Sequence, residues 1–121
     1  MKKDSYLYNA TALNVVDGDT VDFAVDLGFD TTLNVRVRLN GVDTPEIHSK
    51  LIENRVRAQS AKRFVSDAIL NKQVVLKTYK VDKYGRYLAD IFVNDNPVSI
   101  NEQLIAAGHA TSYDGGKKPT E

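Results

Sequence analysis

The sequence predicts an α+β fold built mainly from β-strands: five strands in a Greek-key barrel, with one long and one short helix. Several short segments alternate apolar and polar residues, which is typical of half-buried strands. After the third such segment the apolar spacing changes to that of a helix, and two more strand-like segments follow. The chain has 121 residues, which is the length of one domain.

The first three strands are expected within the first 39 residues. Residues 6–16 combine apolar and strand-forming residues and end at the turn signal Asp17-Gly18. Residues 21–25 place a large apolar side chain at every second position. Residues 31–39 repeat this alternation, with Arg36 and Arg38 on the face opposite the apolar side chains. Both arginines are therefore expected to point away from the core.

Two helices and two further strands are expected in the rest of the chain. Residues 54–70 have helical apolar spacing, residues 73–79 and 87–93 are strand-like, and a tight loop around Gly85 joins the two strands. Ser99 and Glu102 form a capping box for a short helix, which Gly108 is placed to end. This order is typical of a five-stranded barrel of the oligonucleotide/oligosaccharide-binding (OB-fold) type. A sheet with helices on one side has a similar order.

We expect a single domain over residues 1–121, with its core at about residues 6–110 and a flexible tail at residues 111–121. Lys plus Arg number 16 and Asp plus Glu number 16, so the chain has no global field to attract a polyanion or a membrane surface. Without Cys, and with only two His, a zinc site is not expected, and a metal would be held by oxygen atoms.

The start of the chain lacks the unbroken apolar core of a signal peptide, and no segment approaches the roughly 20 apolar residues of a membrane span. We therefore expect a cytoplasmic monomer that does not contact membranes. A mature secreted domain from which the signal has been removed is the alternative.

Two acidic motifs each have a purely structural interpretation. Asp17-Gly18 is a common turn with solvated carboxylates, which leaves the second carboxylate, Asp19, unexplained. Thr44-Pro45-Glu46 is a common helix start, although helical spacing becomes convincing only near residue 54.

A metal site is the functional interpretation of the same residues. Asp19 and Asp43 follow predicted strand ends, and two carboxylates brought together repel unless a cation lies between them. Ca²⁺ suits such a site, since it accepts carboxylates, a backbone carbonyl such as that of Thr44, water and a phosphate oxygen. Mg²⁺ is less favoured. Paired carboxylates are also typical of glycosidases, but the arginines favour a phosphate.

Basic and aromatic residues complete the candidate site. Arg38 and Arg86 together would clamp a phosphodiester, although each alone is more commonly a solvated surface residue. Lys83 and Tyr84 flank Arg86 as a point charge and a stacking surface, and Tyr113 is a weaker candidate for stacking. His48 is expected to be an exposed loop residue.

The segments VVDGDTV, VRLNGVDTPE, DKYGRYLADIFV and AAGHA, with the long helix after the second, resemble the thermonuclease (staphylococcal nuclease-like) family over residues 10–108. The resemblance implies that Asp19, Asp43 and the Thr44 carbonyl bind Ca²⁺, and that Arg38 and Arg86 hold the scissile phosphate. It also implies that Glu46 orients or deprotonates the attacking water. It further implies that Lys83, Tyr84 and, with a looser match, Tyr113 stand at positions that contact the nucleotide in this family.

The expected function is therefore a calcium-dependent endonuclease, a hydrolase of phosphodiester bonds in DNA and RNA, with single-stranded substrates favoured. The family resemblance implies attack of water on phosphorus and departure of the 5′ oxygen, which leaves 3′-phosphate ends. Little sequence preference is expected, because phosphate clamps and stacking carry little base information. The alternatives are a non-cleaving nucleic-acid or protein-binding module on the same barrel and an OB-type domain for another ligand.

Overall fold

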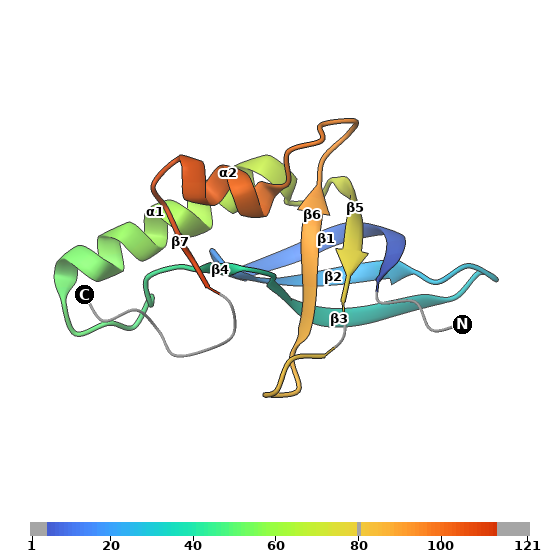
Figure 1. Ribbon diagram of the computed structural model, residues 1–121, viewed down its shortest axis with the longest axis horizontal. Helices are drawn as coiled ribbons and strands as arrows, with labels where there is room; N and C mark the ends of the chain where they lie inside the picture. The colour runs from blue at the N-terminus through green and yellow to red at the C-terminus, as the bar shows by residue number, and fades with distance from the viewer. Residues whose placement is uncertain (1–4, 80, 114–121) are drawn as a thin grey trace.

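The computed structural model describes residues 5–79 and 81–113. Its barrel strands are β1 (Tyr6–Asp17), β2 (Thr20–Asp26), β3 (Thr32–Leu39), β5 (Gln73–Thr78) and β6 (Tyr87–Phe92). The other elements are β4 (Val42–Asp43), α1 (Ile52–Ile69), α2 (Ile100–Ala106) and β7 (Thr111–Ser112). The strands close a barrel in the order β1-β2-β3-β6-β5, and α1 and α2 lie against each other on one side of it (Figure 1). The predicted fold class is confirmed.

The barrel closes through one parallel strand pair. All other neighbours in the barrel are antiparallel, but β3 and β6 run in the same direction, with Val37 opposite Tyr87 and Arg38 opposite Leu88. The connection between these two strands contains β4, α1 and β5. This pairing brings the end of β3 beside the loop that precedes β6, and so brings two distant segments of the sequence together.

The core fills the barrel and the gap beneath α1. Phe23, Leu39, Leu76 and Ile91 are completely buried, and α1 buries the face that carries Val65 and Ile69. The predicted alternation in β3 holds only toward its end. Val37 and Leu39 are buried, but Leu33, at the start of β3, is 48% exposed although its partner Val25 is buried.

The start of α1 differs from both sequence-based interpretations. Thr44-Pro45-Glu46 lies in an irregular segment after β4, so its interpretation as a helix start is wrong, and α1 begins at Ile52 rather than near residue 54. The cap residue Leu51 has extended backbone angles and no capping side chain of its own. The Ser49 hydroxyl accepts a hydrogen bond from the Leu51 N–H instead, which helps to hold the loop between β4 and the helix.

The C-terminal end of the described chain pairs with β4 and with the turn before it. Thr111 and Ser112 pair with β4, and the Tyr113 N–H donates to the Gly41 carbonyl at 2.8 Å. Residues 111–113, the start of the tail predicted to be flexible, thus have backbone partners in β4 and in the turn before it. Residues 114–121 lie outside the described residues.

Both ends of α2 are as expected. The Ser99 hydroxyl caps the start of the helix by accepting a hydrogen bond from the Glu102 N–H, and Gly108, just after its end, has a φ of 81°.

The turn between β1 and β2 packs directly against α1 through Gly18. A Cβ atom added to Gly18 would lie 2.8 Å from Ala61 Cβ and 3.0 Å from Thr44 Cγ2, which is closer than side chains tolerate. The glycine therefore has a packing reason in addition to its turn propensity: it allows α1 to approach the segment that carries Asp19.

We expect Gly18→Ala to lower the free energy of unfolding by about 1 to 3 kcal/mol, because the added methyl group overpacks a rigid contact with α1. Urea unfolding followed by circular dichroism measures the effect. In a double-mutant cycle with Ala61→Gly, part of the loss should be recovered. An unchanged urea midpoint for Gly18→Ala would show that the contact is not tight.

A buried side-chain network ties the turn after β3 to β6 and α2. Asn101, which is 3% exposed, accepts from the Ile91 N–H and donates to the carbonyls of Asn40 and Ala89. It also donates to Asp90, whose other carboxylate oxygen accepts from the Tyr79 hydroxyl. Burial and the hydrogen bond to Asp90 raise the pKa of Tyr79 to about 12. This network holds the Asn40-Gly41 turn that separates two candidate site residues, Arg38 and Asp43.

The raised pKa of Tyr79 predicts a specific loss of stability in alkali. The neutral hydroxyl is favoured in the folded protein, so its contribution is complete below the ordinary pKa of 10 and is lost as the pH rises toward about 12. The difference in unfolding free energy between the wild type and Tyr79→Phe should therefore shrink between pH 10 and pH 12. Tyr87→Phe, at an exposed tyrosine, is the control. A constant difference for Tyr79→Phe across this range would contradict the assignment.

Candidate active site

Asp19 is buried at the turn between β1 and β2. Its side chain accepts hydrogen bonds from the Thr20 hydroxyl at 3.0 Å and from the Thr44 N–H at 3.2 Å, and the residue is 6% exposed. Its backbone carbonyl accepts from the Leu39 N–H at 2.8 Å. The turn interpretation of Asp17-Gly18 left Asp19 unexplained, and the structure shows that Asp19 is buried and oriented by contacts with β3 and with the segment after β4.

Arg38 connects Asp19 to Asp43. Its Nη1 lies 3.0 Å from Asp19 Oδ2, and its Nη2 lies 3.3 Å from Asp43 Oδ1 and donates to the Val42 carbonyl at 3.1 Å. The Arg38 side chain is only 12% exposed. As expected, it does not join the Val37 and Leu39 side chains in the core, but it is not solvated either. One guanidinium therefore holds the two carboxylates predicted to bind a metal.

Arg86 is oriented by a residue that the sequence reasoning missed, Asp82. The Asp82 carboxylate accepts from the backbone N–H groups of Tyr84 and Arg86, and its Oδ2 lies 2.7 Å from both Nε and Nη2 of Arg86. Although burial alone raises the pKa of Asp82, these hydrogen bonds lower it below its ordinary value. Burial alone lowers the pKa of Arg86, but Asp82, with a smaller contribution from Tyr113, raises it. The spacing of Asp82 and Arg86 within one short loop was the available signal.

The structure brings most of the predicted site residues to one pocket of about 280 Å³. Its lining consists of Asp17, Asp19, Thr20, Arg38, Asp43, Thr44, Pro45, Glu46, Arg86 and Tyr113. One pocket is thus lined by the predicted metal ligands, both arginines and the predicted general base. Their elements are far apart in sequence and meet because β3 and β6 are paired in the barrel.

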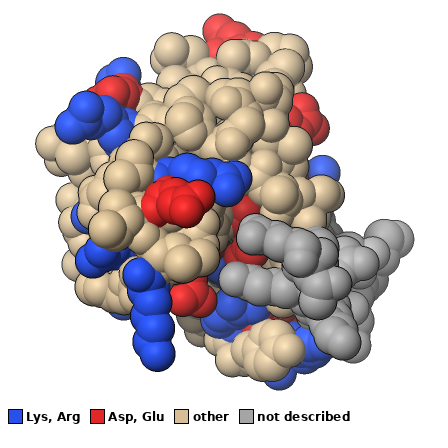
Figure 2. All heavy atoms as spheres, turned by 90° about the vertical axis from the view of Figure 1, so that its left-hand side faces the viewer, with Lys and Arg blue, Asp and Glu red and all other residues tan. Residues whose placement is uncertain are grey.

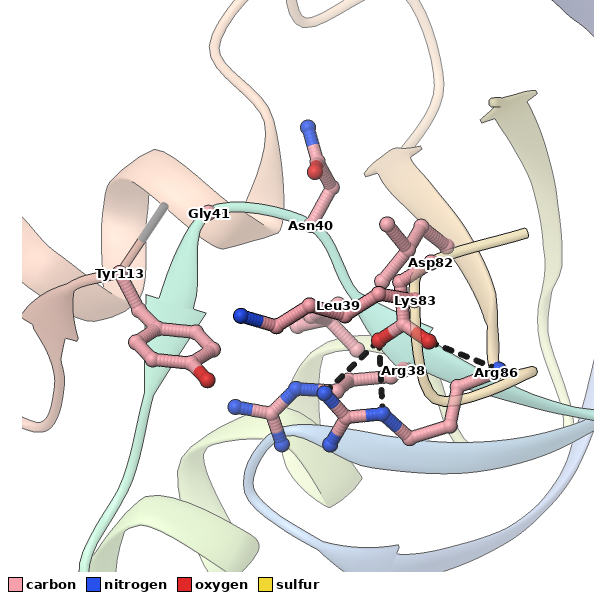
Figure 3. A pocket seen from close by; sticks show the side chains of 9 residues that line it. Arg38, Leu39, Asn40, Gly41, Asp82, Lys83, Arg86 and Tyr113 are labelled. Atoms are coloured by element: carbon pink, nitrogen blue, oxygen red, sulfur yellow. Dashed lines mark hydrogen bonds and ion pairs between the residues drawn. The ribbon is translucent and has the colours of Figure 1, made fainter. Parts of the chain in front are cut away.

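A second pocket of about 280 Å³ adjoins the first and contains Lys83. Arg38, Arg86 and Tyr113 line both pockets. Figure 3 shows the two guanidinium groups side by side, the Asp82 carboxylate against Arg86, and the Lys83 amino group directed toward the Tyr113 ring. The Arg38 guanidinium carbon lies 5.3 Å from the Tyr113 ring centroid, within the range of a cation–π contact. Tyr113, the loosest of the sequence matches, is therefore part of this site.

Tyr84 differs from the other predicted contact residues, because it does not line either of these pockets. Its ring is 63% exposed and lies 5.2 Å from Lys83 Nζ and 5.1 Å from the Arg86 guanidinium carbon. Tyr84 covers the outer side of these two cations. His48 is exposed, as expected.

The first pocket carries more negative than positive charge. Four carboxylates (Asp17, Asp19, Asp43 and Glu46) face two guanidinium groups, a formal excess of two negative charges. Sequence reasoning did not select Asp17. Burial and then the charge of Asp19 raise the pKa of Asp17, with a smaller contribution from Glu46 and with Lys62 and His48 acting in the opposite direction. Carboxylates this close repel one another, and a bound divalent cation would relieve that repulsion.

The donor chemistry of this pocket fits a hard divalent cation. Asp19 and Asp43 supply carboxylate oxygens, and Thr44 is 5% exposed on the same wall. In residues 5–79 and 81–113, however, no three His, Cys, Asp or Glu side chains are grouped as a metal site. A cation here would therefore also need backbone, water or phosphate oxygens, which Ca²⁺ and Mg²⁺ accept.

Charge on the face shown in Figure 2 is mixed. Figure 2 shows Lys and Arg side chains spread over one face, with Asp and Glu side chains among them, rather than gathered into one basic patch. Attraction of a polyanion would thus depend on local groups such as Arg38, Lys83 and Arg86. None of the helices in the described part of the chain has the length and apolarity to span a membrane.

Comparison with protein families agrees with the fold and the motifs. The family model described as staphylococcal nuclease homologue matches residues 36–121, which include the end of β3, the loop after β4 and β6. The chain belongs to this family. The match covers Arg38, Asp43, Thr44, Glu46 and Arg86 of the first pocket, while Asp17, Asp19 and Thr20 precede it. The resemblance seen in the sequence motifs is confirmed at the level of the family.

The chain covers different shares of the individual relatives that it resembles. An uncharacterized protein of Methanocaldococcus jannaschii is 34% identical over 88% of this chain and 59% of its own length, and protein ParB of Escherichia coli is 27% identical over 84% and 55%. A probable staphylococcal-like nuclease of Oryza sativa is 32% identical over 64% of the chain and 19% of its own length. The chain thus spans a little over half of the first two relatives and a smaller part of the third.

The two arginines of β3, Arg36 and Arg38, allow a matched test of the buried network. Arg38→Gln removes the guanidinium that pairs with Asp19 and Asp43, so we expect the free energy of unfolding to fall by about 3 to 5 kcal/mol, as for other broken buried pairs. Arg36→Gln breaks an exposed pair with Asp22 and should cost much less. Urea unfolding of both variants at pH 7 without divalent cations gives the comparison. Equal losses would show that the Arg38 network is not effectively buried.

Proposed function

We propose that this chain is a calcium-dependent nuclease that acts as a monomer and hydrolyses phosphodiester bonds of DNA and RNA with little sequence preference. The observation that carries the proposal is that Asp19, Asp43, Glu46, Arg38 and Arg86 line a single pocket. Membership of the nuclease family supports the same reaction class. The family includes relatives named as a probable staphylococcal-like nuclease and as a probable endonuclease of Paracoccidioides lutzii.

Arg38 and Arg86 would hold the scissile phosphate. Each guanidinium has five N–H donors, and the ion pairs with Asp19, Asp43 and Asp82 engage only some of them. Planar guanidinium groups bind phosphate oxygens through paired hydrogen bonds. Since both are already held in position by carboxylates, they would stabilise the extra negative charge that builds up on the phosphate during attack, with little rearrangement.

Glu46 would act as the general base. It is exposed to solvent at the rim of the pocket, where water can reach its carboxylate. As the water oxygen forms its bond to phosphorus, a proton passes to Glu46, the bond from phosphorus to the 5′ oxygen breaks, and that oxygen takes a proton from solvent. The products are a 3′-phosphate end and a 5′-hydroxyl end.

Asp19, Asp43 and the Thr44 carbonyl would hold the Ca²⁺, with Mg²⁺ as the less favoured ion. A bound cation would supply positive charge next to the phosphate and polarise it as a Lewis acid. The four carboxylates of the pocket outnumber its two arginines, and this excess of negative charge supports the binding of a divalent cation between them. Asp17, on the same wall, would add to the attraction for the cation.

The substrate class follows from the second pocket. Lys83 and Tyr113 offer a charge for a phosphate and a ring for a base or sugar, and Tyr84 offers a further exposed ring. Stacking on aromatic rings accepts any base, and it needs bases that are not already paired, which favours single strands. Phosphate and stacking contacts carry little sequence information.

Glu46→Gln is the sharpest test of this function. The amide cannot take the proton, so kcat on single-stranded DNA in Ca²⁺ should fall by about 10²- to 10⁴-fold. Cleavage is measured by gel electrophoresis with DNA and RNA oligonucleotides, and EDTA should abolish it. Glu53→Gln, at an exposed glutamate in the first turn of α1, is the matched control and should cleave at the wild-type rate.

Equal cleavage by the wild type, Glu46→Gln and the EDTA-treated sample would contradict the proposal. Tight calcium-independent binding of oligonucleotides without turnover would instead indicate a non-cleaving binding module. Replacement of Ca²⁺ by Mg²⁺ in the same assay tests the choice of ion.

A further inference from the structure

A third pocket, of about 310 Å³, lies on the other side of the loop that carries Glu46. Residues 43–46 line both this pocket and the first one, so the loop after β4 forms a shared wall. The opposite wall comes from the N-terminal half of α1 and from the segment that leads into β7, and includes Asn54, Arg57 and His109. We refer to it as the Arg57 pocket. Figure 1 shows the loop after β4 running to the start of α1, with β7 returning beside β4.

Arg57 differs from the arginines of the first pocket. Arg38 and Arg86 are each held by carboxylates, whereas Arg57 has no hydrogen bond or ion pair with any side chain in residues 5–79 and 81–113. Its side chain is exposed and lines the Arg57 pocket. A guanidinium with its donors available beside a pocket is suited to bind an anion. Nothing in the fold requires it, because α1 buries a different face, which carries Ala58, Ala61 and Val65.

The other polar groups of the Arg57 pocket suit a phosphate with a sugar attached. Asn54 and Ser49 are hydrogen-bonded to each other at 3.5 Å and present amide and hydroxyl groups. His109 packs its ring on Phe64, with centroids 5.1 Å apart, which fixes the position of the imidazole. Of the two carboxylates in the lining, Asp43 is already paired with Arg38, and Glu46 lies on the shared wall. Arg57 is thus the group that would draw a phosphate to this side of the loop.

We infer that the Arg57 pocket binds the phosphate of the nucleotide next to the one being cleaved, so that the substrate strand passes over the Glu46 loop. The inference rests on the proposed function and extends it: the strand would be held on both sides of the scissile bond, by Lys83 and Tyr113 on one side and by Arg57 on the other. A strand bound this way contributes one more phosphate contact than a dinucleotide does. Chain length, rather than base identity, is then the feature of the substrate that this pocket recognises.

The test compares Arg57→Gln with Arg55→Gln. Arg55 is also an exposed arginine of α1, but it lines a groove on another face of the helix, so the control removes the same charge. We expect Arg57→Gln to lower kcat/KM for a single-stranded octanucleotide by about tenfold, the effect of losing one charge-assisted hydrogen bond. Cleavage of a dinucleotide without terminal phosphates should not change in Arg57→Gln. Arg55→Gln should resemble the wild type on both substrates. An equal effect of Arg57→Gln on the two substrates, or no effect on either, overturns the inference.

A binding measurement separates this inference from the proposed function. Fluorescence anisotropy with the octanucleotide is recorded at several salt concentrations, in Ca²⁺, using Glu46→Gln with and without Arg57→Gln. The slope of log affinity against log salt should decrease in magnitude by about 0.7 when Arg57 is replaced, the value for one phosphate contact to a single strand. If the wild type does not cleave but this slope changes as expected, the proposed hydrolysis fails and the pocket assignment stands. An unchanged slope, or no binding of the octanucleotide, overturns the assignment.

Discussion

Arg38 lies between two carboxylates, Asp19 and Asp43, and the geometry of the candidate site depends on these contacts. The three residues come from β3, the turn after β1 and the short strand β4. One buried carboxylate, one partly buried carboxylate and a partly buried guanidinium are costly to remove from water, and they are tolerated when each charge has a partner and its hydrogen bonds are satisfied. No side-chain polar atom that is fully buried in the described residues lacks a partner. The ion network thus connects the three segments while keeping their functional groups directed at one pocket.

The same network explains why the site carries an excess of negative charge. Arg38 alone cannot neutralise Asp17, Asp19, Asp43 and Glu46, and the second arginine is held by its own partner, Asp82. A site optimised only for stability would replace some of these carboxylates, since like charges at short range oppose folding. Their retention in one pocket is the physical argument for a cation and for a phosphate whose charge the cation and the arginines share.

Most of the barrel could be predicted because its signals are local. Alternation gave β2 and the end of β3, helical spacing gave α1, and the capping box at Ser99 gave the start of α2. Two features could not be read this way. The two-residue strands β4 and β7 are too short for any periodic pattern and exist only through their pairing. The start of α1 at Ile52 follows from the Ser49 loop rather than from the helix-start signal at Thr44-Pro45-Glu46.

The sequence allowed the residues of the candidate site to be predicted, but less so the residues that hold them in position. Asp19, Arg38, Asp43, Glu46 and Arg86 could be selected because chemistry suggests carboxylates with arginines, and the family resemblance set their order. That Asp82 orients Arg86, that Asn101 holds the turn after β3, and that Gly18 is required for helix packing all depend on contacts between distant segments. Such contacts leave little trace in the local sequence pattern. Tyr113 shows the opposite case: its motif match was loose, and its place beside Arg38 comes from the hydrogen bond of its backbone to Gly41.

The parallel pairing of β3 with β6 determines when the candidate site can form as the chain folds. Arg38 and Arg86 are 48 positions apart in the chain, and they become neighbours only when the barrel closes between these two strands. Closing so long a loop is a late and entropically costly event in folding. A nascent chain that has emerged only as far as β5 therefore contains Arg38 but not yet Arg86. During synthesis, the pocket that Arg38 and Arg86 share can therefore form only once β6, the last barrel strand, is in place.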